Sequence, residues 1–542
     1  MEAGAAMKRR DFLAASASLG LLACGQRAGS ALPPGELLGP RLDLGHRLRG
    51  GNSLPAPSEQ RRVGALIVGA GMAGLSCAWW LQRQGEQDFA LLELENEAGG
   101  NARAGRNAVS AYPWGAHYLP IPGEEAIELR QMLAEFGALQ GDPAAVRPRY
   151  EERYLCHSPQ ERLYIHGRWQ EGLLPQFGLA AGELAEQQCF LAQMAELKLQ
   201  RDAQGQRRFT VPSARGMRRD GAEVGQSMYD WLHAHGYRAP SLHWWVNYGC
   251  RDDYGTDYRH TSAWAGLHYF ASRHGLASNA SEDEVLTWPE GNAWLTRRMA
   301  ERLDERLITG ALVWRVAEVK QGMQVDVYLP AEQRSVRYLA DKLVWSGQLG
   351  FLPHLWPSLP APWRAACAAL DYAPWLVANL SLRQPPAERG GANAPPSWDN
   401  VLYQGQGLGY IDARHQDLSQ HHPATVLSYY RPLSETSPRQ ARQQLLATSQ
   451  ADWAAQILRD LAPAHPDLAQ HCVQLDVWRW GHAMVRPTPA LLAGPALASL
   501  RVPQGRVILA HSDLSGFSLA EEAHYWGVRA ARWLGGERVV TA

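Results

Sequence analysis

Lysine is almost missing from this sequence of 542 residues, in which 49 of the 53 basic residues are arginines. The four lysines are Lys8, Lys198, Lys320 and Lys342, so a catalytic lysine has few possible positions. The formal net charge is −1, and no basic run occurs past the N-terminus. The charge pattern of a nucleic-acid-binding protein is therefore excluded.

Cysteine pairs and long apolar runs are scarce as well. The seven cysteines include no CxxC pair, so they predict no specific disulfide, and the histidines show no metal-ligand spacing with acids or cysteines. We therefore expect no metal site. The apolar run that ends at Ala23 is too short for a transmembrane helix, and no other segment has transmembrane character. The 46% hydrophobic content predicts a large core, in two domains.

The stretch LIVGAGMAGLSCAWWL, residues 66–81, contains a glycine turn of the dinucleotide-binding type. The apolar residues that end at Val68 predict a buried parallel strand, and helical spacing follows as far as Gly85. A second apolar run, 89–92, ends at Glu93, which is placed to accept hydrogen bonds from a ribose diol. Strand, GxGxxG turn, helix and acid at this spacing predict a bound dinucleotide.

Each position of the turn has a physical role. Gly69 permits the tight turn, Gly71 lets a pyrophosphate approach the backbone, and Gly74 lets the helix pack closely on the strand. The phosphates are expected on the free N–H groups of the helix start, at Met72 and Ala73, where the helix dipole favours anions.

The N-terminus resembles a bacterial export signal. KRRDFL, residues 8–13, has the twin arginines of a Tat signal, and LLACG resembles a lipobox in which Cys24 is lipidated. This interpretation makes residues 1–24 a signal and the Gly-, Pro-, Ser- and Arg-rich residues 25–60 a tether. It predicts a periplasmic protein that is lipid-anchored to a bacterial membrane. An ordinary cleaved signal is the alternative, and Met7 is an alternative start.

The predicted export bears on the identity of the dinucleotide. The Tat route carries folded proteins, often with a cofactor already inserted. A diffusible nicotinamide pool is not expected outside the cytoplasmic membrane, whereas a tightly bound flavin would travel with the protein. Export therefore favours FAD over NAD.

The stretch LENEAGGNARAGR, residues 94–106, resembles the flavin amine oxidase and phytoene desaturase superfamily. In that family an acid is followed by Gly-Gly-Arg. Gly99 and Gly100 match this pattern, and Arg103 stands two places late. The resemblance implies that these three residues approach the diphosphate and ribose of FAD.

A second stretch, YPWGAHYLPIPG at 112–123, is similar to the family segment that runs past the flavin ring. The resemblance implies that Gly115 and Ala116 lie near the isoalloxazine. His117 belongs to the same segment and is a catalytic candidate, with a purely structural histidine as the alternative.

Later parts of the chain resemble the same family. Residues 288–303 resemble its glycine loop and helix, and residues 308–328 predict a β-hairpin, followed by a buried strand at 339–345. In the family, the residue at the position of Val313 pairs its backbone with the adenine.

The C-terminal stretch GRVILAHSDLSGFSLAEEAHYWGVRAARWL, residues 505–534, resembles the closing motif of the family. Ser512 or Asp513 takes the place of the usual acid at the diphosphate, and Ala523 fits the helix that follows. His511 replaces the usual glycine. In the family this helix directs its N-terminus at the flavin and stabilises the reduced ring.

The resemblance implies an α/β fold in which a Rossmann-like FAD-binding domain is assembled from discontinuous segments, together with an α+β substrate domain. The boundaries that we expect are 61–123, 285–350 and 500–542 for the FAD-binding domain, and 124–284 and 351–499 for the substrate domain.

The catalytic residues are less evident. Many amine oxidases hold a lysine in the loop that corresponds to residues 346–360, and this loop has none. His354 is its one titratable residue and a candidate. Trp480, in a segment that resembles the family's tryptophan-containing stretch over the flavin, is another. Lys198 lies in a helical stretch elsewhere.

Residues 248–270 allow two interpretations. Asp252 and Asp253 could lie in a cavity and suit a cationic amine, or the stretch could be a solvated loop that ends in a helix cap at Thr261 or Ser262. The sequence alone favours the loop.

The function predicted is that of an FAD-dependent oxidoreductase, which takes a hydride from an amine or an unsaturated compound and passes electrons to oxygen or a redox partner. The alternative is an exported flavin-fold lipoprotein that binds a ligand or partner without turnover.

Overall fold

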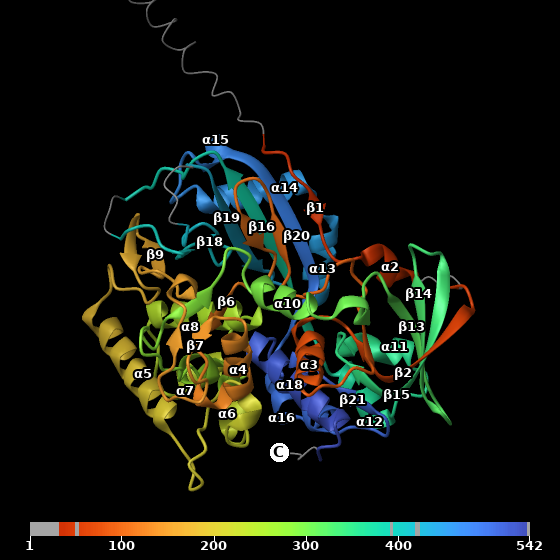
Figure 1. The fold of residues 1–542 in the computed structure, drawn as a ribbon. Helices are drawn as coiled ribbons and strands as arrows, with labels where there is room; N and C mark the ends of the chain where they lie inside the picture. Colours follow the sequence, from red (N-terminus) through yellow and green to blue (C-terminus); the bar gives the residue numbers. More distant parts are fainter. Residues whose placement is uncertain (1–31, 49–53, 391–393, 418–422, 539–542) are drawn as a thin grey trace, which may run out of the picture.

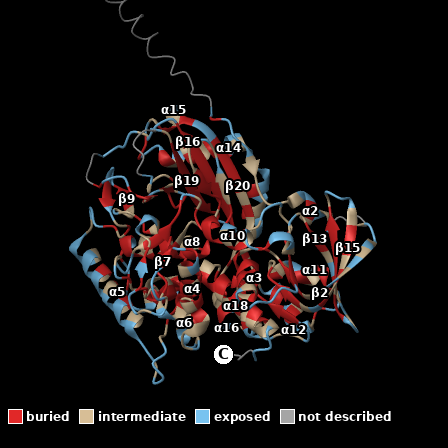
Figure 2. Ribbon diagram, in the orientation of Figure 1, coloured by how far each residue is buried: buried red, intermediate tan, exposed pale blue. Residues whose placement is uncertain are grey.

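The computed structural model describes residues 32–48, 54–390, 394–417 and 423–538 (Figure 1). Two large sheets and a lobe of helices surround the pair of helices α3 (Met72–Arg83) and α18 (Ala520–Leu534). Buried residues gather in the two sheets and on these central helices (Figure 2).

The first sheet has the topology of a dinucleotide-binding fold, with the strand order β12-β3-β2-β15-β14-β13 and with β21 paired to β15. Its strands are β2 (Pro57–Val68), β3 (Phe89–Leu92), β12 (Leu307–Ile308), β13 (Leu312–Val319), β14 (Gly322–Leu329), β15 (Arg334–Trp345) and β21 (Val507–Leu509). β2 runs parallel to β3 and β15, and every residue of β3 is buried, as expected for strands covered on both faces. The predicted α/β fold with a discontinuous Rossmann-like domain is confirmed.

Two layers cover this sheet. α3 and α18 pack tightly together on one face, because a Cβ atom added to Gly527 would lie 2.1 Å from the carbonyl oxygen of Ala73. A separate apolar cluster contains residues of the sheet together with α11 (Leu352–Leu355) and α12 (Ala361–Ala368). β2 ends at Val68 and α3 begins at Met72, so the carboxyl end of this strand leads directly into the N-terminus of α3.

The second sheet has the order β1-β20-β16-β19-β18-β17-β9-β10. Its strands are β1 (Leu37–Leu38), β9 (Glu161–Ile165), β10 (Arg168–Glu171), β16 (Tyr372–Leu382), β17 (Asp399–Leu402), β18 (Tyr410–Asp412), β19 (Thr425–Pro432) and β20 (Cys472–Val485). One apolar cluster joins the sheet to α13 (Pro438–Ala447) and α14 (Gln450–Leu461), and another is rich in tryptophan and tyrosine. This aromatic cluster includes residues of the segment predicted to pass the flavin ring.

The lobe of helices packs around a third apolar cluster. Its main helices are α5 (Ala181–Leu199), α7 (Met228–Ala234), α8 (Pro240–Tyr254) and α9 (Ala263–Ala271). Connecting elements between the lobe and the sheets include β6 (Tyr118–Pro120), α4 (Ile127–Glu135), β11 (Val285–Thr287) and α10 (Ala293–Ala300). The predicted domain boundaries stay a prediction, since several of these elements contribute to the same cores as the sheets.

The predicted tether at 25–60 is wrong where the structure describes it. Residues 32–48 contain β1 and the helix α2 (Leu42–Arg47), and β2 already begins at Pro57. The apolar side chains of this segment explain the difference, because Leu44 is buried and β1 adds to the edge of the second sheet. The predicted signal and Cys24 lie outside the described residues. Within those residues no helix is long and apolar enough to cross a membrane.

Candidate active site

The glycine turn forms an open cradle at the end of β2. Gly69 has a φ of +102°, which favours glycine, and a Cβ atom on Gly74 would lie 1.9 Å from the carbonyl oxygen of Gly69. A Cβ atom on Gly71 would approach only the Cα atom of Gly100, at 3.8 Å. α3 begins at Met72 without a side-chain cap. Its first N–H groups are therefore free to bind an anion in this open space.

Glu93 follows β3 and is held by two backbone donors. Its Oε2 accepts a hydrogen bond from the N–H of Ala70 at 2.7 Å, and its Oε1 accepts one from the N–H of Glu95 at 2.9 Å. Burial raises the pKa of the Glu93 carboxyl. A carboxylate offers about four acceptor positions, so about two remain for a ribose diol.

The Gly-Gly loop lies against the glycine turn. The N–H of Gly99 donates to the carbonyl oxygen of Ala70 at 2.8 Å. The buried guanidinium of Arg103 donates to Oε2 of Glu95 at 3.0 Å and to the carbonyl oxygen of Glu97 at 2.9 Å. The Nε atom of Arg103 is buried and has no partner among the described residues. One donor of this guanidinium is thus left for a ligand.

The adenine side of the predicted site is joined to the same loop. Val313 lies in β13, next to an irregularity in its pairing with β14. The N–H of Ala311 donates to the carbonyl oxygen of Glu93 at 2.7 Å. Val313 therefore lies two residues after Ala311, which is hydrogen-bonded to Glu93, the acid that is predicted to bind the ribose.

The C-terminal loop places its two candidate residues differently. The carboxylate of Asp513 is fully buried, and its Oδ2 accepts a hydrogen bond from the Tyr372 hydroxyl at 2.6 Å. Its N–H donates to Nδ1 of His511 at 3.1 Å, so His511 caps the turn of its own loop. Ser512 and Ala523 are both 8% exposed, and Ala523 belongs to the apolar core of α3 and α18. Sequence reasoning missed Tyr372, because it lies 141 positions from Asp513.

Tryptophans fix the segment at the predicted flavin ring. The N–H of Ala116 donates to the carbonyl oxygen of Asn101 at 2.9 Å. The indole N–H of Trp480 donates to the carbonyl oxygen of Trp114 at 2.6 Å, and the rings of Trp114 and Trp478 lie 5.5 Å apart. Trp480 thus lies at the predicted ring, where it positions the backbone.

His117 lies in an aromatic environment next to this segment. Its ring is 4.3 Å from the ring of Tyr430, at an interplanar angle of 31°, and 5.5 Å from the ring of Trp398. Burial lowers the pKa of His117 to about 4, so the imidazole is neutral at pH 7. The hydroxyl of Tyr430 donates to the carbonyl oxygen of Gly115 at 3.0 Å. These rings form an aromatic wall next to the segment predicted to pass the flavin ring.

Four carboxyl groups, which we call the acid compartment, lie beside this wall. They are Glu161 at the start of β9, Asp252 and Asp253 at the end of α8, and Asp399 at the start of β17. Glu161 and Asp399 are direct neighbours in the parallel pairing of β9 and β17. Like charges at neighbouring positions of a sheet repel each other, so this arrangement favours a cation or protons in the compartment.

The acid compartment has little compensating charge from the described residues. Nη2 of Arg273 donates to Oδ1 of Asp253 at 2.9 Å, and the Tyr118 hydroxyl lies 3.4 Å from the same oxygen. Burial, with the charge of Asp253 as a second cause, raises the pKa of Asp252 to about 7. Burial also raises the pKa of Glu161 to about 7 and that of Asp399 well above its usual range. Near neutral pH Asp252 and Glu161 can therefore exchange protons for a bound cation.

The solvated-loop interpretation of residues 248–270 is wrong. Asp252 and Asp253 belong to α8, and Asp253 is only 5% exposed. Ser262 stands at the N-cap of α9 but makes no side-chain capping hydrogen bond. No pattern in the sequence pointed to Glu161 or Asp399, which lie far from α8 in the chain.

Two other candidates lie elsewhere. His354 is exposed on α11, which packs with the first sheet, and this position does not support a catalytic role. Lys198 lies on α5 at the outer edge of the molecule and pairs with Glu282 at 3.0 Å (Figure 1). Lys342 is another possible position for a catalytic lysine, but it donates to the carbonyl oxygens at the end of α18.

No group of three potential metal ligands occurs in the described part of the chain, and the expected absence of a metal stays a prediction.

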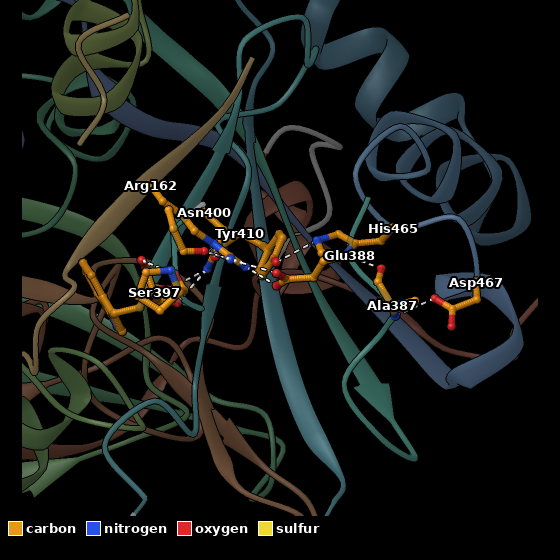
Figure 3. Close-up of polar contacts among 11 residues, drawn as sticks. Arg162, Ala387, Glu388, Ser397, Asn400, Tyr410, His465 and Asp467 are labelled. Atoms are coloured by element: carbon orange, nitrogen blue, oxygen red, sulfur yellow. Dashed lines mark hydrogen bonds and ion pairs between the residues drawn. The ribbon is translucent and has the colours of Figure 1, made fainter. Parts of the chain in front are cut away.

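A second buried polar network has a structural explanation. Arg162 is 1% exposed, and it donates to Oδ1 of Asn400 at 2.6 Å and to the carboxylate of Glu388 (Figure 3). The Tyr410 hydroxyl and Nε2 of His465 lie 2.8 Å apart in the same group. These pairs hold the chain after β16 on β9 and β17, and so keep Asp399 in place.

The residues of the first sheet fit a bound FAD. The uncapped start of α3, the open space at Gly71 and the orphan Nε of Arg103 suit a diphosphate, and the free acceptor positions of Glu93 suit a ribose. The position of the flavin ring beside Gly115 and Ala116 stays a prediction from the resemblance.

Comparisons with known proteins agree with this geometry. The family model described as flavin containing amine oxidoreductase matches residues 72–534. A search of curated proteins finds no match.

Solved structures share the fold. Wild-type putrescine oxidase bound to putrescine has a TM-score of 0.63 at 14% identity, over 88% of this chain and 100% of that chain. Cyclohexylamine oxidase from Brevibacterium oxydans has a TM-score of 0.63 at 15% identity, over 88% of this chain and 99% of that chain. A fatty acid isomerase from P. acnes that produces CLA has a TM-score of 0.61 at 13% identity, over 87% and 98%.

Proposed function

Because the chain belongs to the family of flavin-containing amine oxidoreductases, we propose that it oxidises a cationic amine that is held in the acid compartment. The family establishes an FAD-dependent oxidoreductase, and this confirms the predicted enzyme class and cofactor. The identity of the substrate is the proposal. Nothing supports the alternative of a binding protein without turnover.

The acid compartment is the observation that carries this proposal. Its four carboxyl groups have one guanidinium among them, that of Arg273, and this cation is already bonded to Asp253. An ammonium group would neutralise part of the remaining charge. A buried carboxylate that is paired with a cation costs less free energy than an unpaired one, so the pairing would favour binding of the amine. The rings of His117, Trp398 and Tyr430 add faces over which a cation is attracted.

FAD, when bound, supplies the acceptor for the hydride that leaves the carbon next to the substrate nitrogen. The residues of the chain orient the substrate and exclude water. An amine must lose a proton before its carbon–nitrogen bond can become a double bond, and Asp252 can accept that proton because its pKa is about 7. His117 is neutral and acts as part of the aromatic wall.

An unsaturated acid is the second candidate substrate class, because a fatty acid isomerase shares the fold. The charge of the acid compartment argues against it. The carboxylate of such a substrate would lie beside Glu161 and Asp399, where burial and the neighbouring acids already disfavour negative charge. An amine is therefore favoured over an unsaturated acid.

Anaerobic reduction of the flavin by a panel of compounds tests this proposal. The panel contains putrescine, cyclohexylamine, a neutral amide of similar size and linoleate. We expect bleaching of the visible flavin band by at least one amine and not by the amide or linoleate. Asp399→Asn should slow the bleaching, whereas Asp220→Asn, at an exposed position, should not. Bleaching by linoleate alone would contradict the proposal.

The proposal includes export through the Tat route and a lipid anchor at Cys24, on the periplasmic face of a bacterial membrane. Its support is the sequence KRRDFL and the LLACG stretch. The electron acceptor would then be oxygen or a periplasmic redox partner. Fractionation of cells that express the full chain tests this. Cys24→Ser should move the protein from the membrane fraction to the soluble fraction, and an unchanged distribution would refute the anchor.

A further inference from the structure

The segment before the glycine turn connects the two sheets. Residues 32–48, which we call the strap, run along β20 and then reach β13 and β14 through α2 (Figure 1). The family model begins at residue 72, so the strap lies outside the matched part of the chain. Its contacts are consequently a property of this chain that the family match does not describe.

One end of the strap is fixed to the second sheet. β1 pairs in parallel with β20, with Leu38 opposite Trp478. The N–H of Val477 donates to the carbonyl oxygen of Glu36 at 2.9 Å, and the N–H of Glu36 donates to Oδ1 of Asp476 at 2.8 Å. This end is held by regular backbone pairing.

The other end is fixed by apolar packing. Leu44 of α2 is 3% exposed and forms a small cluster with Leu312 of β13 and Tyr328 of β14. Arg47 adds its guanidinium over the ring of Tyr328, at 5.0 Å from the centroid. The strap is therefore anchored at both ends, on either side of the loop from Glu93 to Arg103.

Arg41 lies between these anchors and contacts the loop itself. Its backbone N–H donates to Oε1 of Glu95 at 2.8 Å, and its Nη1 donates to Oδ1 of Asn96 at 3.1 Å. The other carboxylate oxygen of Glu95 accepts from Arg103 at 3.0 Å. The N–H of Glu95 in turn donates to the carboxylate of Glu93 at 2.9 Å.

We propose that Arg41 is a positioning residue for FAD, which acts through Glu95 on Glu93 and Arg103. Both of these residues have free capacity toward the cofactor, as described above, and both depend on the Glu95 carboxyl or backbone for their orientation. A fixed orientation lowers the cost of binding because less freedom is lost when the ligand binds. Arg41 thereby slows the release of FAD through its contact with Glu95. This inference rests on FAD as the cofactor and does not depend on the amine substrate.

Release of FAD from the purified holoprotein tests the proposal. After dilution into a mild chaotrope, the rise of flavin fluorescence gives the release rate. Arg41→Ala removes the guanidinium, and Arg41→Pro also removes the backbone donor; the φ of −62° at this position is compatible with proline. Loss of a hydrogen bond to a charged group predicts release about tenfold faster for Arg41→Pro, with Arg41→Ala between it and the wild type.

Two further variants separate positioning from general stability. Arg47→Ala weakens the same strap but makes no bond to Glu95, so it should release FAD at the wild-type rate. Arg41→Lys keeps the charge and the backbone donor, so its release should be slower than that of Arg41→Ala. Wild-type release from Arg41→Pro, or equal acceleration by Arg47→Ala, would overturn the proposal. If Arg41→Pro does not fold, Glu95→Ala takes its place, because it removes the carboxylate that accepts from both Arg41 and Arg103, and wild-type release from that variant overturns the proposal. No substrate is used, so failure of the amine proposal leaves this test unaffected.

Discussion

Asp252→Asn removes a carboxyl group whose pKa lies near 7, and its effect on amine binding should therefore depend on pH. Below pH 7 the wild-type carboxyl is largely protonated and attracts a cation weakly. Above pH 7 it is ionised and attracts a cation strongly. Alkylammonium groups titrate at about pH 10, as lysine does, so the substrate keeps its charge over this range.

The size of the effect follows from the pKa. For a group that titrates at about pH 7, the ionised fraction rises from roughly one tenth at pH 6 to roughly nine tenths at pH 8. If the amine binds the ionised form, KM should fall about tenfold over these two pH units. Glu161 titrates in the same range and can add to the slope.

Steady-state kinetics at constant ionic strength, with the amine that reduces the flavin fastest, provide the assay. We expect the wild-type KM to fall as the pH rises from 6 to 8. Asp252→Asn should have a higher KM at pH 8 and a weaker dependence on pH, while Asp220→Asn behaves as the wild type. A KM that is independent of pH, or the same slope in Asp252→Asn, would contradict binding of the amine by the ionised carboxyl of Asp252.

Three further changes test separate parts of the account. Gly74→Ala places a Cβ atom 1.9 Å from the Gly69 carbonyl oxygen, so the purified variant should contain little flavin by visible absorbance; full flavin content would contradict the described turn. Tyr372→Phe leaves the buried Asp513 carboxylate without that donor and should lower the free energy of unfolding by about 1–3 kcal/mol in urea titrations. An unchanged midpoint would argue against that contact. His117→Gln should leave every inflection of the rate profile between pH 5 and 8 in place, because burial lowers the pKa of His117 to about 4, and a lost inflection would show that this histidine titrates there.

The dinucleotide part of the fold could be predicted from the sequence because its signals are local. The strand that ends at Val68, the turn at Gly69 and the acid at Glu93 follow one another within residues 57–93, and the positive φ of Gly69 explains why glycine is needed there. The hairpin at 308–328 and the strand at 339–345 could be predicted from their apolar pattern. In the structure β13 begins only at Leu312, whereas β14 and β15 are longer than predicted.

The acid compartment could not be predicted in the same way. Glu161, Asp252 and Asp399 come from three separate elements and meet only after β9, β17 and α8 have packed together. A charged pair such as Asp252-Asp253 is more often found in solvent, so the loop was the expected outcome, and burial by α8 overrides it.

The strap shows a different limit. Residues 25–60 have the glycine, proline and serine content of a tether. Composition alone does not show that two of these residues can pair with a strand from a distant part of the chain. β20 offers that partner, and the pairing of Leu37 and Leu38 with it turns part of the expected tether into structure.

Anaerobic titration of the purified holoprotein with putrescine and cyclohexylamine, followed by the absorbance of the flavin, tests whether the enzyme oxidises a cationic amine held in the acid compartment. We expect loss of the visible band with at least one of these amines, and a smaller effect of the same amine on Asp399→Asn. A flavin that both amines leave oxidised, but that a neutral or anionic unsaturated compound reduces, would contradict the assignment of the acid compartment to a cationic amine.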